Sequence, residues 1–126
     1  MFLHVGVLPS LIAKSIPEIN LQIQNELGSK LALEEDFLES ISAPLWFRGL
    51  ALSREEVEAA HVDAVLAAYD VDRIIVGHTP EQGIILPRFG SKVLVTDTEI
   101  AAYYGGHRAC LQIENKLFIS KQAIRS

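Results

Sequence analysis

Two histidines follow short apolar runs at places where the chain can turn sharply. His4 comes after three apolar residues and lies two positions before Gly6, while His78 directly follows Gly77 at the end of Ile74–Val76. A neutral imidazole at the end of a strand can bind a divalent metal ion. For either histidine alone, a hydrogen bond to a backbone carbonyl is the more common role. As a pair, His4 and His78 are candidate metal ligands.

The other two histidines fit structural positions better. His61 shares the apolar face of an expected helix, where a histidine is more often a core residue. His107 follows the glycine pair at 105–106, and we expect it to be exposed at a turn. Neither pattern indicates a ligand.

Apolar runs predict the strands that would carry the two candidate ligands. The run Phe2–Val7 ends before Pro9, and Ile74–Val76 ends at the Gly-His-Thr-Pro stretch, as is typical of buried strands. Further short strands are expected at 84–86, 92–96, 109–113 and 117–119, separated by turn residues.

Helical periodicity predicts what lies between the first two strands. Apolar residues recur four apart over 16–37, a helical pattern that the Gly-Ser pair at 28–29 interrupts. Ser53 and Glu56 form an S-x-x-E capping box before a helix that ends near Tyr69. The segment 40–52 has no clean period and is interpreted as a loop that packs aromatic side chains.

This order of elements predicts an α/β or α+β layered domain with one mixed sheet and helices on one face. Parallel pairing of the strand at 2–7 with Ile74–Val76 would bring His4 and His78 to the carboxyl ends of both strands. Open α/β sheets bind ligands at these ends. We therefore expect the two histidines to converge.

Composition limits the classes of function. The 126 residues fit one domain, 1–126, and 11 Lys and Arg against 16 Asp and Glu give a net charge of -5, which argues against a nucleic-acid partner. No apolar run approaches the ~20 residues of a membrane helix, so no membrane partner is expected. Cys110 is the single cysteine. A lone cysteine suits a reducing compartment, and we expect a cytoplasmic protein.

Five segments, in order, resemble motifs of calcineurin-like metallophosphoesterases related to phosphoprotein phosphatases. The most specific is V-D-R-I-I-V-G-H-T-P at 71–80 with Q-G at 82–83, which resembles V-x-R-I-V-x-G-H-T-P-x-x-G. The others are H-V-G-V at 4–7, similar to H-G-G-I, A-P-L-W-F-R-G at 43–49, similar to P-L-W-Y-R-G, and V-T-D-T at 95–98 with Y-Y-G-G-H-R-A-C-L at 103–111, similar to I-D-T-G and Y-G-G-x-x-A-C-L. The resemblance implies the C-terminal half of a layered α/β sandwich of the metallophosphoesterase type.

The same resemblance implies roles for five residues. His4 and His78 would be ligands of a two-metal centre that holds manganese, iron or zinc. Arg48 would bind the substrate phosphate with its planar guanidinium, and Tyr104 would line the phosphate pocket. Asp97 would support the metal-binding residues without itself binding the metal. Without the resemblance, Arg48 fits a surface ion pair and Asp97 a turn residue equally well.

The chain also departs from the family's pattern. The motifs G-D-x-H-G, G-D-x-x-D-R-G and G-N-H-E, which carry the other metal ligands in the family, do not occur in the 126 residues. Val5 stands where the family has a glycine, and a β-branched residue is a poor substitute if that backbone needs a positive φ. Glu99 replaces the glycine of I-D-T-G and adds a negative charge near the pocket.

These observations leave two hypotheses about function. One is a truncated or split metal-dependent phosphatase for phosphate monoesters, including phosphoproteins, that is inactive as a lone chain. The other is a non-catalytic, degenerate phosphatase-like domain that acts by binding a partner or by self-association. Because half a sandwich would leave apolar surface uncovered, we expect a homo-oligomer or a complementing chain.

Overall fold

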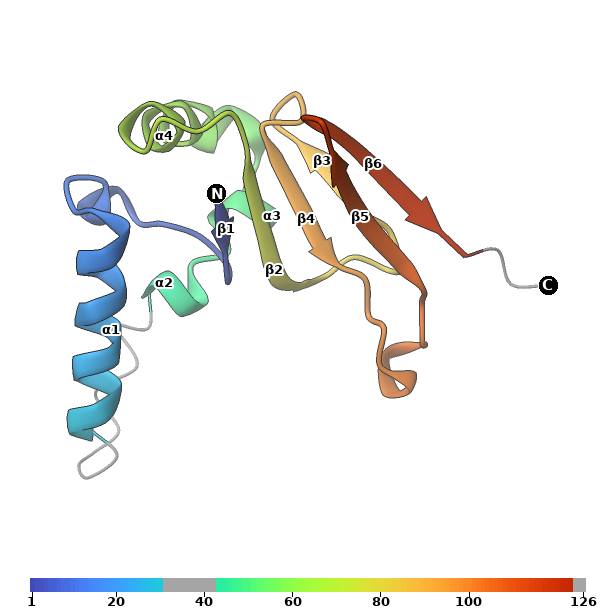
Figure 1. Cartoon of the computed structure of the whole chain (residues 1–126), viewed down its shortest axis with the longest axis horizontal. Coiled ribbons are helices and arrows are strands. Elements are labelled where there is room, and N and C mark those ends of the chain that lie inside the picture. The colour runs from blue at the N-terminus through green and yellow to red at the C-terminus, as the bar shows by residue number, and fades with distance from the viewer. Residues whose placement is uncertain (31–42, 124–126) are drawn as a thin grey trace.

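The computed structural model describes residues 1–30 and 43–123 and contains a four-stranded mixed sheet (Figure 1). Its strands are β1 (Phe2–Leu3), β2 (Ile74–Pro80), β3 (Leu86–Arg88) and β4 (Val93–Asp97), in the order β1-β2-β4-β3. The pairs β1–β2 and β2–β4 are parallel, and β3 runs antiparallel to β4. The predicted parallel pairing of the first strand with Ile74–Val76 is confirmed.

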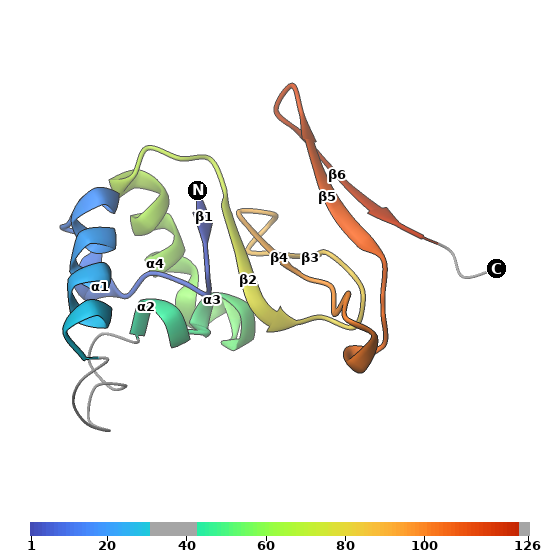
Figure 2. The same ribbon diagram turned by 60° about the horizontal axis from the view of Figure 1, so that its bottom comes forward.

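The helices lie on one side of this sheet and a β-hairpin lies on the other (Figures 1 and 2). The helices are α1 (Ile16–Lys30), α2 (Ala43–Trp46), α3 (Gly49–Leu52) and α4 (Glu55–Ala68), with short 3-10 turns η1 (Pro9–Leu11) and η3 (Ala102–Tyr104). The hairpin pairs β5 (Ala109–Glu114) with β6 (Leu117–Gln122). The predicted α/β fold with a mixed sheet and helices on one face is confirmed, but the expectation of a single sheet was wrong, because the hairpin forms a separate two-stranded sheet. Within the described ranges, none of these helices could span a membrane.

The two central strands are buried on both faces, which explains why their sequences are uniformly apolar. Alternate residues Ile74 and Val76 pack with the helices in the larger core cluster, which also includes Leu50, Val62, Val65, Val93 and Val95. Ile75 and Leu94 face the other way and pack with Leu111 and Phe118 of the hairpin. The sheet thus separates two apolar layers, one of helices and one of the hairpin.

Several predicted boundaries were wrong. The first strand covers only Phe2–Leu3, because the chain bends away from β2 directly after His4. The strand expected at 84–86 lies at Leu86–Arg88. Gly28 does not interrupt α1, and a Cβ at this position would meet no atom within 4 Å. The rest of the predicted helix, 31–37, lies outside the described residues.

The segment interpreted as a loop contains the short helices α2 and α3. Helices of four residues are too short to show a 3.6-residue period, so the pattern could not reveal them. The predicted capping box of α4 was also wrong. Ser53 ends α3, where its amide donates to the Gly49 carbonyl, and Arg54 begins α4 without a side-chain cap.

A capping box is instead present at the start of α1. The Ser15 amide donates to the Glu18 carboxylate at 2.7 Å, and the Glu18 amide donates back to the Ser15 hydroxyl at 3.4 Å. This reciprocal pair satisfies amides that have no partner within the helix. The Ser15 hydroxyl also donates to the Glu18 carboxylate at 2.6 Å, and this bond, followed by the bond from the Ser15 amide, lowers the pKa of the Glu18 carboxyl.

Arg88 joins the sheet edge to the junction of α3 and α4. Its guanidinium donates to the carbonyl oxygens of Leu50, at 2.9 Å, and of Ser53, and lies 3.6 Å from the Glu55 carboxylate. The Arg88 side chain is only 11% exposed. Bonds from a charged, nearly buried donor contribute more than surface ion pairs. Arg88 therefore fixes the segment that carries α2 and α3.

We predict that Arg88→Gln lowers the free energy of unfolding by about 2–4 kcal/mol, because two carbonyl acceptors at the end of α3 lose a charged donor. Urea denaturation followed by circular dichroism measures this change. The control is Arg54→Gln, whose side chain is 82% exposed and which should change stability by less than about 0.5 kcal/mol. Equal effects of the two substitutions would contradict this role of Arg88.

Candidate functional site

His4 and His78 lie side by side at one end of the sheet. The Ile75 amide donates to the Met1 carbonyl at 2.8 Å, and the Gly77 amide donates to the His4 carbonyl at 3.0 Å. These bonds bring the two imidazoles into a stacked arrangement, with centroids 4.3 Å apart and planes at 28°. The predicted convergence of the two histidines is confirmed.

The backbone of β2 is distorted at His78. The residue has a φ of 53°, and the pairing of β2 with β4 is irregular between Val76 and Pro80. A non-glycine residue in this region carries a cost of roughly 1 kcal/mol or more, and such costs persist where the surroundings impose them. The distortion turns the His78 side chain to the exposed end of the sheet, next to His4.

The short helices α2 and α3 bring a tryptophan and an arginine to the histidine pair. Trp46 meets the His78 ring edge-on, with centroids 5.6 Å apart and planes at 73°. Arg48 is half-buried at the start of α3, and its charge acts on the His4 imidazole. The structure thus brings together His4, His78 and Arg48 of the predicted site and adds Trp46.

A close approach between two backbone segments places Arg48 near His4. A Cβ at Gly6 would lie 2.8 Å from both the Phe47 ring and the Phe47 carbonyl oxygen, so only glycine fits. His61 from α4 supports the same contact: its Nε2 donates to the Val7 carbonyl at 2.6 Å, and its ring meets Phe47 edge-on. His61 therefore has the structural role that its place on the apolar face predicted.

Electrostatics favour a neutral His4. Burial is the main cause that lowers the pKa of His4 below its ordinary value of 6.5, and the positive charges of His78 and Arg48 lower it further. The unfolded chain binds the His4 proton more tightly than the folded chain does. The contribution of neutral His4 to folding stability is therefore fully present above about pH 6.5 and is lost as the pH falls through the pKa of His4 in the folded chain. A neutral imidazole has a lone pair that can accept a hydrogen bond or bind a metal.

Asp97 and Tyr104 occupy less central positions. Asp97 ends β4, the strand next to β2, and its carboxylate accepts a hydrogen bond from the Glu99 amide at 3.2 Å. This bond fits the turn role as well as a supporting role. Tyr104 lies in η3, is 57% exposed, and packs edge-on against Tyr103. Among the described residues, the ring contact of Tyr104 is with Tyr103 and not with the histidine pair.

Two expectations about individual residues, His107 and Val5, are corrected, and Glu99 shows a further feature. His107 is half-buried rather than exposed, because the glycines at 83 and 105 leave room for its ring, and it lies 3.7 Å from the Glu99 carboxylate. Val5 is buried and does not adopt a positive φ, so valine is not strained there. Glu99 has a φ of 56°, a conformation that glycine adopts at lower cost.

The residues present do not form a metal site by themselves. In ranges 1–30 and 43–123, no group of three or more His, Cys, Asp or Glu side chains could hold a metal ion. Metal sites in proteins normally have at least three protein ligands, and the histidine pair supplies two. A metal at His4 and His78 would need ligands from outside the described part of the chain.

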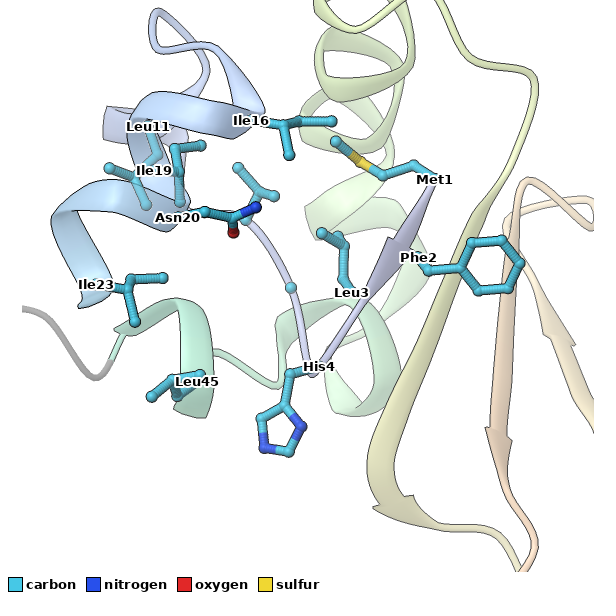
Figure 3. Close-up of a pocket in the computed structure, with 12 residues that line it drawn as sticks. Met1, Phe2, Leu3, His4, Leu11, Ile16, Ile19, Asn20, Ile23 and Leu45 are labelled. Carbon is cyan, nitrogen blue, oxygen red and sulfur yellow. The ribbon is translucent and has the colours of Figure 1, made fainter. Parts of the chain in front are cut away.

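A cavity of about 180 Å3 lies between β1 and α1, and of the clustered site residues only His4 is in its lining. Its walls are mainly apolar, with Leu3 and Met1 on one side and Ile19 and Ile23 on the other (Figure 3). His4 lies at one end, and its ring points away from the apolar side chains (Figure 3). The histidine pair therefore faces the outside rather than this cavity.

Comparisons with solved structures identify the fold. A cold-active protein tyrosine phosphatase solved at 1.1 Å matches 96% of this chain with a TM-score of 0.73 and 27% identity. The cold-active protein-tyrosine phosphatase of a psychrophilic Shewanella species matches 96% with a TM-score of 0.72 and 23% identity. The chain therefore has a phosphatase-like α/β fold.

Sequence comparison finds a relative in Schizosaccharomyces pombe, the uncharacterized protein C1840.07c, which is 31% identical over 117 residues and 89% of this chain. No protein-family model matches the chain. The chain spans 35% of the length of the yeast relative and 36–37% of the solved phosphatases. It thus corresponds to about a third of each of these proteins.

Trp46 is the site residue that sequence reasoning missed. The aromatic residues before Arg48 were visible as part of a packed segment, but nothing in their spacing showed that the indole would meet His78. The signal was the closeness of Trp46 to Arg48 in the sequence, since Trp46 ends α2 and Arg48 begins α3 only two positions later.

We predict that His4 titrates below pH 6.5 and that Arg48→Gln raises the pKa of His4, because a nearby positive charge is removed while burial remains. Two-dimensional NMR of the imidazole protons against pH measures this value. Arg54→Gln, which changes an exposed arginine on another element, should leave the pKa of His4 unchanged. An unaltered His4 titration in Arg48→Gln would contradict the placement of Arg48.

Proposed function

We propose that this chain is one part of a metal-dependent phosphomonoester hydrolase of the calcineurin-like type and does not hydrolyse phosphoesters as a lone chain. The observation that carries the proposal is the convergence of His4, His78 and Arg48 at the carboxyl ends of parallel strands in a phosphatase-like fold. The similarity of the motif segments to that family adds the calcineurin-like assignment.

Arg48 is the residue that would bind the phosphate. Arg48 is half-buried, and no ion pair among the described residues includes it, so its guanidinium can meet an oxyanion. An arginine matches two phosphate oxygens with parallel N–H bonds and stabilises negative charge that develops there. Trp46 supplies an aromatic wall beside the same place.

In this proposal, the metal site is shared between this chain and a second segment or chain. His4 and His78 would contribute two nitrogen ligands to manganese, iron or zinc, and the remaining ligands would come from a complementing segment or chain. A closed site needs more ligands than this pair provides. The partner in this proposal is therefore either a second chain with the missing ligands or an oligomer that covers the open surface.

The substrate in this proposal is a phosphate monoester, including phosphoproteins. Two of the solved proteins with this fold are protein tyrosine phosphatases by name, so phosphotyrosine is one substrate to test. The edge-on contact of Trp46 with His78 leaves the indole 53% exposed at the site. An exposed indole can pack against the aromatic ring of such a substrate.

The alternative function is a non-catalytic domain. It is favoured by the lack of a third metal-binding side chain beside the histidine pair in ranges 1–30 and 43–123. In that case, Arg48 and the two histidines would catalyse no reaction, and the chain would act through a partner or through self-association.

A chimera separates the two functions. We predict no manganese-dependent turnover of p-nitrophenyl phosphate by the lone chain, and measurable turnover when the chain replaces its matched segment in the Shewanella phosphatase. In the chimera, Arg48→Gln should lower kcat at least ~100-fold, because a charged donor to the transition state is lost. Steady-state kinetics with manganese measures both.

The controls make each outcome interpretable. Tyr103→Phe in the chimera alters a 90% exposed residue and should leave kcat within about twofold. A folded chimera without activity, by circular dichroism and kinetics, would favour the non-catalytic alternative. Turnover by the lone chain that disappears in His78→Ala would show that the chain completes the site itself and would refute this proposal.

A further inference from the structure

A second cavity, of about 410 Å3, lies between the sheet and the β5–β6 hairpin. Its floor is apolar and includes Ile85 and Leu94 from the sheet side and Leu111 and Phe118 from the hairpin. The hairpin stands on the side of the sheet away from the helices (Figure 2). Pockets for small ligands commonly have volumes of about 300–1,000 Å3 and mainly apolar walls with a few polar groups.

The cavity lies far from the histidine pair. Arg73, which lines it, comes immediately before β2, whereas His78 lies near the carboxyl end of that strand. The two residues are five positions apart, or roughly 16 Å at about 3.3 Å per residue of strand. A ligand in the cavity would not reach the candidate phosphate site.

Arg73 is the main charged group of the cavity. Its guanidinium lies 4.5 Å from the centre of the Phe118 ring, and one of its N–H groups donates to the Ser91 carbonyl at 2.8 Å. Arg73 is half-buried, yet among the described residues no carboxylate lies within ion-pair distance of it. A guanidinium has five donors, and the bond to the Ser91 carbonyl uses one of them.

The charge around the cavity has one sign. Lys116 is the second cation of its lining, Ser91 and Ser120 are also present, and no acidic residue of the described chain lines it. Glu114, close to Lys116 in sequence, accepts a hydrogen bond from the Gln112 side chain and is not part of the lining. A cavity with only positive charge in a chain of net charge -5 favours an anion.

We propose that this cavity binds a small amphiphilic anion, a carboxylate or phosphate that carries a compact apolar group. Arg73 and Lys116 bind the oxyanion, since a guanidinium matches either head group with parallel N–H bonds. The apolar group lies against Leu94, Leu111 and Phe118. The site is independent of the proposed phosphatase function and of any metal.

The test uses the full chain and three probes: octanoate, octyl phosphate and the neutral octanamide. Nitrogen-15 and methyl NMR titrations give the affinity and locate binding through the signals of Leu94 and Leu111. The two anions should bind saturably with millimolar or tighter affinity, and octanamide about tenfold more weakly, because it lacks the charge. The stronger of the two anions identifies the head group.

Two variants assign the effect to the cavity. Arg73→Gln should weaken octanoate binding about tenfold, and Lys116→Gln, in the exposed hairpin turn, should weaken it severalfold without affecting the fold. Arg54→Gln, far from the cavity in sequence and 82% exposed, is the matched control and should bind as the wild type does. Lys116→Gln keeps the proposal testable if Arg73→Gln does not fold.

Three results would overturn the proposal. These are equal affinities for octanoate and octanamide, unchanged octanoate affinity in both cavity variants, and signal changes confined to residues outside the hairpin and β4. Each would mean that the positive charges do not select a ligand here. The experiment contains no phosphatase assay, so its outcome does not depend on whether the chain forms part of a phosphatase.

Discussion

The candidate site depends on one constraint, the close approach of the chain after β1 to the segment that joins α2 and α3. Pairing of β1 with β2 brings His4 to His78, but it does not by itself place Arg48. That requires the Phe47 backbone to lie against Gly6, where any side chain would collide with the Phe47 carbonyl oxygen. Gly6 thus permits the contact that places Arg48 beside the two histidines at the ends of the strands.

Two side chains, Arg88 and His61, stabilise the contact between Gly6 and Phe47. Arg88 occupies the carbonyl groups at the end of α3, and His61 donates to the Val7 carbonyl while its ring packs against Phe47. Both bonds join elements far apart in sequence and are partly shielded from water, which makes them worth more than surface contacts. The positively charged Arg48 and the imidazole of His4 can therefore remain close although they disfavour each other's charge.

Much of this arrangement could be predicted from the sequence, and the failures have physical causes. The apolar runs at β1 and β2 predicted the parallel pair and the meeting of His4 and His78, because strands buried on both faces are recognised by continuous apolar sequence. The helices α2 and α3 could not be predicted, since four residues show no period. Trp46 and the half-buried His107 depend on contacts between distant segments, which local spacing does not contain. The cavity beside Arg73 depends likewise on how far the hairpin lies from the sheet.

The central claim is that Arg48 binds phosphate beside His4 and His78, and phosphate titration tests it most directly. Inorganic phosphate is added to the full chain at pH 7.5 while NMR follows the imidazole signals of His4 and His78 and the indole signal of Trp46. We predict a saturable shift of these signals in the millimolar range that Arg48→Gln abolishes and Arg54→Gln preserves. Signals that do not move, or that move equally in Arg48→Gln, would contradict it.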